Sequence, residues 1–168
     1  LKGWLAYTLS KSEQLTSGRN ISEPGINNGE WYNTPYDKTH DLSVNAVYEL
    51  SSKWKFNTNF LLQTGQPTNY PVGQYEFQGL NVPIYNDNQR NANRLPTYHR
   101  LDLSATLTPV KNNNRDLQAE WVFGIYNIYN RKNAASIAFS RNTETSANEA
   151  IKTSIFGIVP SITYNFKF

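Results

Sequence analysis

The 168-residue chain has the length of one ordinary domain, and its composition excludes several classes of protein. Hydrophobic residues make up 38% and the mean hydropathy is −0.63, so no stretch approaches the roughly 20 apolar residues of a transmembrane helix. The net charge of +3 comes from scattered residues, without the Lys/Arg cluster of a nucleic-acid surface. The chain has no cysteine, which excludes a disulfide framework and a thiolate metal site.

Alternation of apolar and polar residues predicts three strands in the first 64 residues, at 1–10, 41–50 and 54–64. The last two are separated by a tight turn at 51–53, as in an antiparallel hairpin. Residues 11–37 lack this period and are rich in Ser, Asn, Gly, Pro and Glu, which indicates a long polar loop.

Beyond residue 64 the same alternation predicts a strand at 98–108 and another that begins at 117. We expect the second to continue to about residue 139, through a bulge. Residues 65–97, which hold four of the eight prolines, and 141–153 are expected to be long polar loops. A short charged turn is expected at 109–116.

The last thirteen residues predict a sixth strand, with an apolar residue at every second position. Its final aromatic residue is similar to the C-terminal signal by which the barrel-assembly machinery recognises bacterial outer-membrane β-barrels. The residues expected to carry that signal are Ile162, Tyr164, Phe166 and Phe168. The alternative interpretation is an ordinary amphipathic strand that closes a soluble β domain.

Long loops alternate with short turns along the chain, as they do in outer-membrane barrels. Six strands are too few to close such a barrel, and an open sheet edge is not tolerated in hydrocarbon. The chain also begins inside a strand-like pattern with no leader before it. The sequence therefore predicts an all-β fold: an antiparallel, up-and-down segment of a transmembrane β-barrel, with about six strands, belonging to a longer protein.

Six motifs occur in a fixed order, and each is weak by itself. They are G-W-L-A-Y-T-L-S at 3–10, P-Y-D-K-T-H-D-L-S at 35–43, T-G-Q-P at 64–67, R-L-P-T-Y-H-R-L-D-L-S at 94–104, Y-N-I-Y-N-R-K-N at 126–133 and P-S-I-T-Y-N-F-K-F at 160–168. As an ordered set they resemble the C-terminal end of TonB-dependent receptors of the Bacteroidetes type.

This resemblance implies that residues 1–168 are the last six strands of a 22-stranded barrel that encloses an N-terminal plug. Such receptors lie in the outer membrane of Gram-negative bacteria and take up nutrients with energy relayed by TonB. The implied partners are outer-membrane lipid, the remaining strands and plug of the same receptor, the TonB system through the absent N-terminal part, the barrel-assembly machinery and, in one branch of the family, a surface lipoprotein. No nucleic acid, cofactor or enzymatic activity is expected.

Two groups of residues are candidates for contacts with a plug or a ligand. Polar residues on the strands are expected to face the lumen, either toward a plug or substrate path or simply toward water: Asn45, Lys55, Asn57, Asn59, Arg100 and Asp102. Aromatic residues in the loops are candidates for ligand contacts or for packing of the loops: Trp31, Tyr70, Tyr75, Phe77 and Tyr85.

The two histidines, His40 and His99, stand at strand starts beside acidic residues. Neither has a nucleophile motif or a recognisable metal-ligand spacing nearby, so we expect no catalytic or metal site, and we expect both rings to bond to loop backbone.

Two other functions of the chain stay open at this point. One is a barrel fragment captured by the assembly machinery through strand pairing, and the other is a soluble β-sandwich that binds a ligand.

Overall fold

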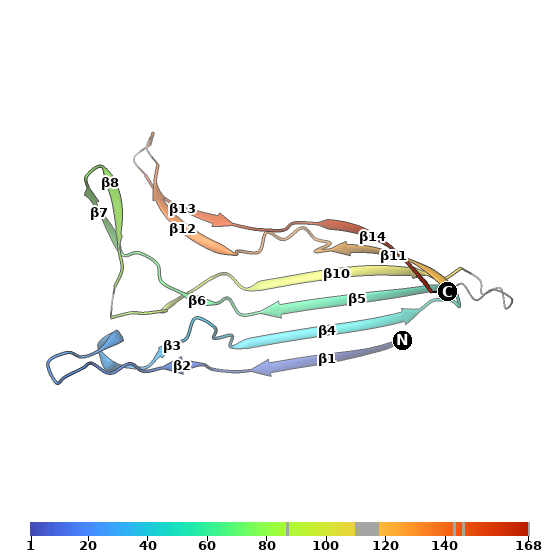
Figure 1. The fold of residues 1–168 in the computed structure, drawn as a ribbon, viewed down its shortest axis with the longest axis horizontal. Coiled ribbons are helices and arrows are strands. Elements are labelled where there is room, and N and C mark those ends of the chain that lie inside the picture. The colour runs from blue at the N-terminus through green and yellow to red at the C-terminus, as the bar shows by residue number, and fades with distance from the viewer. Residues whose placement is uncertain (87, 110–117, 143, 146, 168) are drawn as a thin grey trace.

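The computed structural model describes residues 1–168 except 87, 110–117, 143, 146 and 168. Six strands form one antiparallel sheet, and each pairs with the next in chain order (Figure 1). The strands are β1 (Lys2–Leu9), β4 (His40–Glu49), β5 (Trp54–Gln63), β10 (Tyr98–Leu107), β11 (Gln118–Tyr126) and β14 (Val159–Lys167). The predictions of an all-β, antiparallel fold and of up-and-down order are confirmed.

The long connections all lie at one end of the sheet, and the short hairpin turn lies at the other (Figure 1). That turn joins β4 to β5, and the hydroxyl of Ser51 accepts hydrogen bonds from the N–H groups of Lys53 and Trp54, at 3.3 and 3.1 Å. The turn predicted at 109–116 falls almost wholly outside the described residues.

The long connections contain secondary structure that, apart from residues 136–139, the sequence did not predict. A 3₁₀ turn, η1, spans Ile26–Gly29. Eight short strands form four two-stranded sheets: β2 (Glu13–Gln14) with β3 (Tyr32–Asn33), β6 (Pro67–Thr68) with β9 (Asn93–Arg94), β7 (Gly73–Phe77) with β8 (Leu80–Ile84), and β12 (Ser136–Arg141) with β13 (Asn148–Thr153).

Two predictions about the last third of the chain are wrong. The strand expected from 117 to about 139 ends at Tyr126, because Asn127 and Asn130 adopt positive φ angles of 53° and 55° that an extended strand does not allow. The expected loop at 141–153 is in part the strand β13, which pairs along its whole length with β12.

The register of the six-stranded sheet gives it one apolar face. Directly opposed residues of neighbouring strands share a face, as Leu5, Val44, Phe60 and Leu101 do. The apolar residues on this face are Leu5, Tyr7, Leu9, Leu42, Val44, Ala46, Tyr48, Trp54, Phe56, Phe60, Leu62, Leu101, Leu103, Ala105, Leu107, Ala119, Trp121, Phe123, Ile125, Pro160, Ile162, Tyr164 and Phe166. Mostly polar residues occupy the other face.

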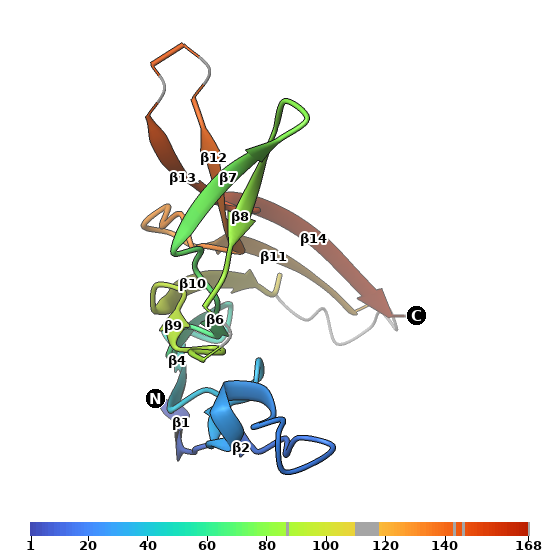
Figure 2. The same ribbon diagram turned by 90° about the vertical axis from the view of Figure 1, so that its left-hand side faces the viewer.

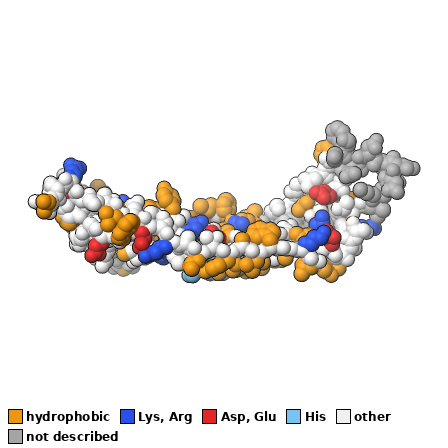
Figure 3. All heavy atoms as spheres, turned by 90° about the horizontal axis from the view of Figure 1, so that it is seen from below, with side chains coloured by type: hydrophobic (Ala, Val, Ile, Leu, Met, Phe, Trp, Pro, Cys, Tyr) orange, Lys and Arg blue, Asp and Glu red, His pale blue; other side chains and the backbone are white. Residues whose placement is uncertain are grey.

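No second layer covers the apolar face within the part of the chain that the structure describes. The buried apolar side chains of the described residues are Tyr32 of β3, with 4% of its surface exposed, and Pro67 of β6, both outside the six-stranded sheet. Leu5 and Ile162, on the apolar face, are 67% and 69% exposed. In the central part of the molecule, hydrophobic side chains lie along the lower edge of the view in Figure 3, below most of the charged side chains.

The end view shows the strands fanning out from β1 to β14, the usual twist of a sheet (Figure 2). Across the described residues, no helix is long and apolar enough to cross a membrane.

Candidate functional site

All six residues expected to face a lumen lie on the polar face of the sheet. Asn45 stands opposite Asn59, which stands opposite Asp102, so these three form one row across β4, β5 and β10. Asn45 also donates from Nδ2 to Oδ1 of Asn57 at 3.0 Å. Lys55 lies nearer the short-turn end, opposite Glu49. The structure therefore brings these residues together as one polar surface.

Arg100 is the centre of a cluster of polar side chains on this face. Its Nε donates to Oδ2 of Asp102 at 2.9 Å, and its Nη1 donates to the hydroxyls of Tyr98 and Tyr126 at 3.2 and 2.7 Å. The guanidinium carbon lies 4.1 Å from the centroid of the Tyr126 ring, a cation–π distance. Sequence reasoning did not single out the two tyrosines, although their positions in the alternation place them on the face of Arg100.

Asp102 also fixes the chain reversal after β11. Its Oδ1 accepts the backbone N–H of Asn127 at 2.9 Å. The buried side chain of Asn127 donates to the carbonyl of Arg131 and accepts the N–H of the same residue, at 2.9 and 3.0 Å. The cluster thus holds a loop on the sheet.

The two histidines lie on the apolar face, at its loop end. His40 opposes Leu9 and His99 opposes Leu62. The expectation that their rings bond to loop backbone is wrong, because Nδ1 of each ring bonds to a tyrosine hydroxyl at 2.8 Å, from Tyr7 for His40 and from Tyr129 for His99. No group of three or more potential metal ligands occurs among the described residues.

An ion pair between Asp37 and Arg94 connects the bases of the first two long loops. The carboxylate of Asp37 is fully buried and accepts hydrogen bonds from the guanidinium of Arg94 and from the N–H of Ser12, the latter at 2.6 Å. Arg94 also donates to the carbonyls of Asp37 and Gly65, at 3.3 and 3.1 Å. Only glycine fits at position 65, because the side chain of any other residue would collide with the carbonyl of Leu95.

The environment of Asp37 favours the ionised carboxylate. Burial by itself raises the pKa of this carboxyl, but hydrogen bonds from Arg94 and from the Ser12 N–H, together with the positive charges of Arg94 and Lys11, outweigh burial. The pKa of Asp37 therefore lies below its ordinary value. We call this group of Asp37, Arg94 and Ser12 the loop latch; nothing in the local sequence pattern indicated it.

The five loop aromatics proposed as ligand contacts do not form one site. The ring of Tyr70 packs edge-on against Phe139 with centroids 5.1 Å apart, and its hydroxyl donates to the carbonyl of Arg94, so it packs loops together. Trp31 is 64% exposed, and Tyr75 and Phe77 are exposed on β7. Tyr85 lines a groove between the first two long loops.

Three of the four expected assembly residues lie on the exposed apolar face of β14: Ile162, Tyr164 and Phe166. The ring of Tyr164 contacts Trp121 of β11, with centroids 4.6 Å apart, and lies 5.9 Å from that of Phe166. β14 pairs with β11 along one edge, and no described strand pairs with its other edge. Phe168 lies outside the described residues.

Comparison with protein-family models, curated proteins and solved structures gave no match to this chain.

Proposed function

We propose that this chain is a C-terminal part of the β-barrel of a TonB-dependent outer-membrane receptor, which takes up nutrients and is not an enzyme. The observation that carries the proposal is the continuous apolar face of the six-stranded sheet, which has no covering layer in the described residues. The ordered motifs and the long loops at one end of the sheet support the same assignment.

A face of this extent needs an apolar environment. Soluble monomers rarely leave contiguous apolar patches larger than roughly a few hundred Å² in water. In a β-sandwich a second sheet about 10 Å away would cover the face. The short sheets in the described loops extend beyond the loop end of the strands instead (Figures 1 and 2). Acyl chains of a lipid bilayer would cover the whole face without any further protein layer.

The two edges of the sheet require further strands if it lies in a membrane. Within the described residues, β1 pairs only with β4 and β14 only with β11, so each has one edge of unpaired backbone groups. Each unsatisfied group costs several kcal/mol in hydrocarbon, and closed barrels avoid this cost by having no edge. Strands from the same receptor, outside residues 1–168, would complete the cylinder. The polar face, with Arg100 and Asp102, would then line its interior around the plug.

Fractionation of cells that produce the natural protein tests the proposal. We expect it in the outer-membrane fraction, resistant to extraction with alkaline carbonate, and more mobile in gel electrophoresis before heating than after. Recovery in the soluble fraction without detergent would contradict the assignment and favour a β-sandwich.

The edge of β14 with which no described strand pairs favours a second role, as the strand by which the assembly machinery recognises the barrel. Strand addition to an exposed sheet edge is a recurring mode of recognition. If this is correct, the double change Tyr164→Asp and Phe166→Asp lowers the amount of assembled barrel and its crosslinking to the machinery. The matched change Thr163→Asp and Asn165→Asp, on the opposite face, has much less effect. Equal effects of the two pairs would contradict this role.

A further inference from the structure

The 3₁₀ turn η1 holds the one Asn–Gly pair of the sequence, Asn28–Gly29. The fold requires glycine at position 29, because its φ is 75° and a Cβ there would lie 2.6 Å from the carbonyl oxygen of Pro24. Asn28 has a φ of 56° and a ψ of 25°, in the left-handed region that is strained for residues with a side chain. The turn therefore places a strained asparagine directly before a residue that must lack a side chain.

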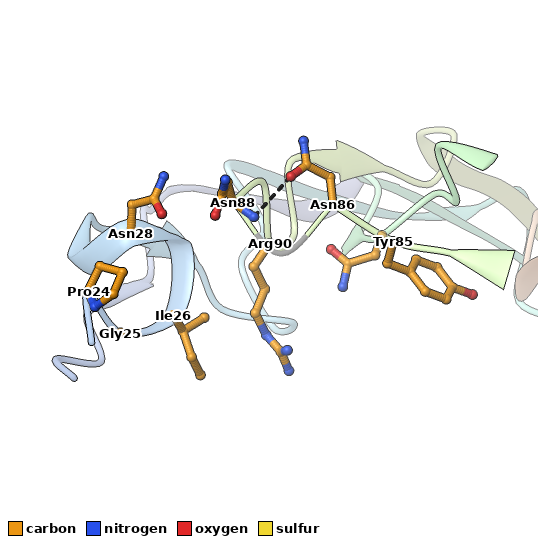
Figure 4. A pocket seen from close by; sticks show the side chains of 9 residues that line it. Pro24, Gly25, Ile26, Asn28, Tyr85, Asn86, Asn88 and Arg90 are labelled. Carbon is orange, nitrogen blue, oxygen red and sulfur yellow. Dashed lines mark hydrogen bonds between the residues drawn. The ribbon is translucent and has the colours of Figure 1, made fainter. Parts of the chain in front are cut away.

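The two neighbouring asparagines of η1 differ in the contacts of their carboxamides. Asn27 donates from Nδ2 to the carbonyl of Trp31 at 3.4 Å, and its Oδ1 accepts the N–H of Arg90 at 3.2 Å. The side chain of Asn28 is exposed and makes no hydrogen bond to another described residue. In Figure 4 it extends from η1 on the side opposite to Ile26. Of the two carboxamides, only that of Asn28 can turn toward the next peptide group without breaking a side-chain hydrogen bond.

An asparagine before glycine can lose its carboxamide nitrogen through its own backbone. The nitrogen of Gly29 attacks Cγ of Asn28, and the absence of a Cβ on glycine leaves that nitrogen unshielded. The new C–N bond closes a succinimide ring, the Gly29 N–H gives its proton to solvent, and the side-chain nitrogen takes up a proton and leaves as ammonia. Water then opens the ring. Cleavage of the bond from Cγ gives aspartate, and cleavage of the bond from the main-chain carbonyl carbon gives isoaspartate.

We propose that Asn28 is a site of spontaneous deamidation, and that both products change the loop side of the protein. Asn28 lines a groove of about 400 Å³ between the first two long loops (Figure 4), so the reaction adds a carboxylate to that lining. Isoaspartate also adds one methylene to the main chain of η1. That segment closes the hydrogen bond from the N–H of Glu30 to the carbonyl of Asn27, at 3.0 Å, and the longer chain separates the two groups.

The inference goes beyond the proposed function and does not depend on it. Its test incubates the natural full-length protein in detergent, in mildly alkaline buffer, and follows the conversion of asparagine by mass spectrometry of its peptides. A zero-time sample, digested in parallel, corrects for reaction during digestion. We expect Asn28 to react at least about tenfold faster than Asn27, and faster as pH rises because the Gly29 N–H must lose its proton. Asn28→Gln abolishes the reaction at this position, and the matched change Asn27→Gln does not lower the rate at Asn28.

Hydrogen exchange at the amide of Glu30 tests the effect of the longer main chain. Electron-transfer fragmentation identifies the isoaspartate form, and ion-exchange chromatography separates it from unreacted protein. We expect the Glu30 amide to exchange at least about tenfold faster in this form than in the variant Asn28→Asp, which adds the same charge without the extra methylene. The proposal is overturned if Asn28 stays unmodified, if Asn27 reacts as fast as Asn28, or if the isoaspartate form and Asn28→Asp exchange equally at Glu30.

Discussion

The loop latch gives the sharpest prediction about the part of the chain beyond the sheet. Replacing Arg94 with alanine removes its contact with the buried carboxylate of Asp37 and its bonds to the carbonyls of Asp37 and Gly65. The carboxylate then keeps only the neutral N–H of Ser12 as a described donor. Breaking a buried ion pair from one side costs about 3 kcal/mol, since it leaves a charge buried without compensation.

That cost corresponds to roughly a 100-fold larger population of the opened loop base. Hydrogen exchange followed by mass spectrometry measures it directly, at the amides of Ser12 and Thr34. The first of these donates to Asp37, and the second donates to the carbonyl of Ser12 at 2.9 Å. We expect both amides to exchange roughly 100-fold faster in Arg94→Ala, while the amides of β4 are unchanged.

Two further variants separate the charge from other effects. The double change Asp37→Asn with Arg94→Ala removes the buried charge, and we expect it to restore part of the protection lost in Arg94→Ala. Arg19→Ala is a control at an exposed arginine of the first loop. The reasoning is refuted if Arg94→Ala accelerates exchange by less than about threefold, or if the double variant exchanges faster than the single one.

Three other predictions follow from the same structure. The pKa of Asp37 is lowered in the folded protein, so the latch contributes its full stability above the ordinary aspartate pKa of about 3.9 and loses it as pH falls through the lowered value. Hydrogen exchange at the amide of Ser12, corrected for intrinsic rates, should therefore stay slow down to about pH 4. Leu103→Arg, on the apolar face, should cost about 2–4 kcal/mol of unfolding free energy in lipid vesicles, against less than about 1 kcal/mol for Ser104→Arg on the polar face. Asn127→Ala should lower the unfolding free energy by about 3 kcal/mol in the same assay, because it removes two hydrogen bonds and alanine is strained at a φ of 53°. Asn127→Gly should lower it by about 2 kcal/mol, because glycine tolerates that φ.

The six sheet strands could be predicted from the sequence because each has one apolar and one polar face. Strict alternation, as in Leu101 to Leu107, fixes both the extended conformation and the face of every residue. The polar positions of Arg100 and Asp102 follow from the same period. For these strands the local pattern and the final register agree.

The end of β11 could not be predicted in this way. Apolar residues continue past Tyr126, but Asp102 of the neighbouring strand binds the N–H of Asn127, and the side chain of Asn127 turns the chain. The β7–β8 hairpin was missed for another reason. Its two central residues, Gln78 and Gly79, have positive φ angles of 53° and 79°, and the exposed strands beside them lack a clear alternation.

The latch and the groove depend on contacts between distant residues. Asp37 and Arg94 are 57 positions apart, and Arg90 meets Asn27 across 63 positions. Each of these residues lies in a polar loop where many others look equivalent. No period or spacing marks them, so only the folded arrangement of the loops identifies them.

The most direct measurement is the accessibility of spin labels along β10 in the natural protein reconstituted into lipid vesicles. The chain has no cysteine of its own, so single cysteines can be placed at Leu101, Asp102, Leu103 and Ser104 in turn. If the apolar face contacts acyl chains, labels at Leu101 and Leu103 collide frequently with oxygen, which partitions into the bilayer, and those at Asp102 and Ser104 do not. Low oxygen accessibility at all four positions would show that protein covers the face and would contradict its contact with lipid.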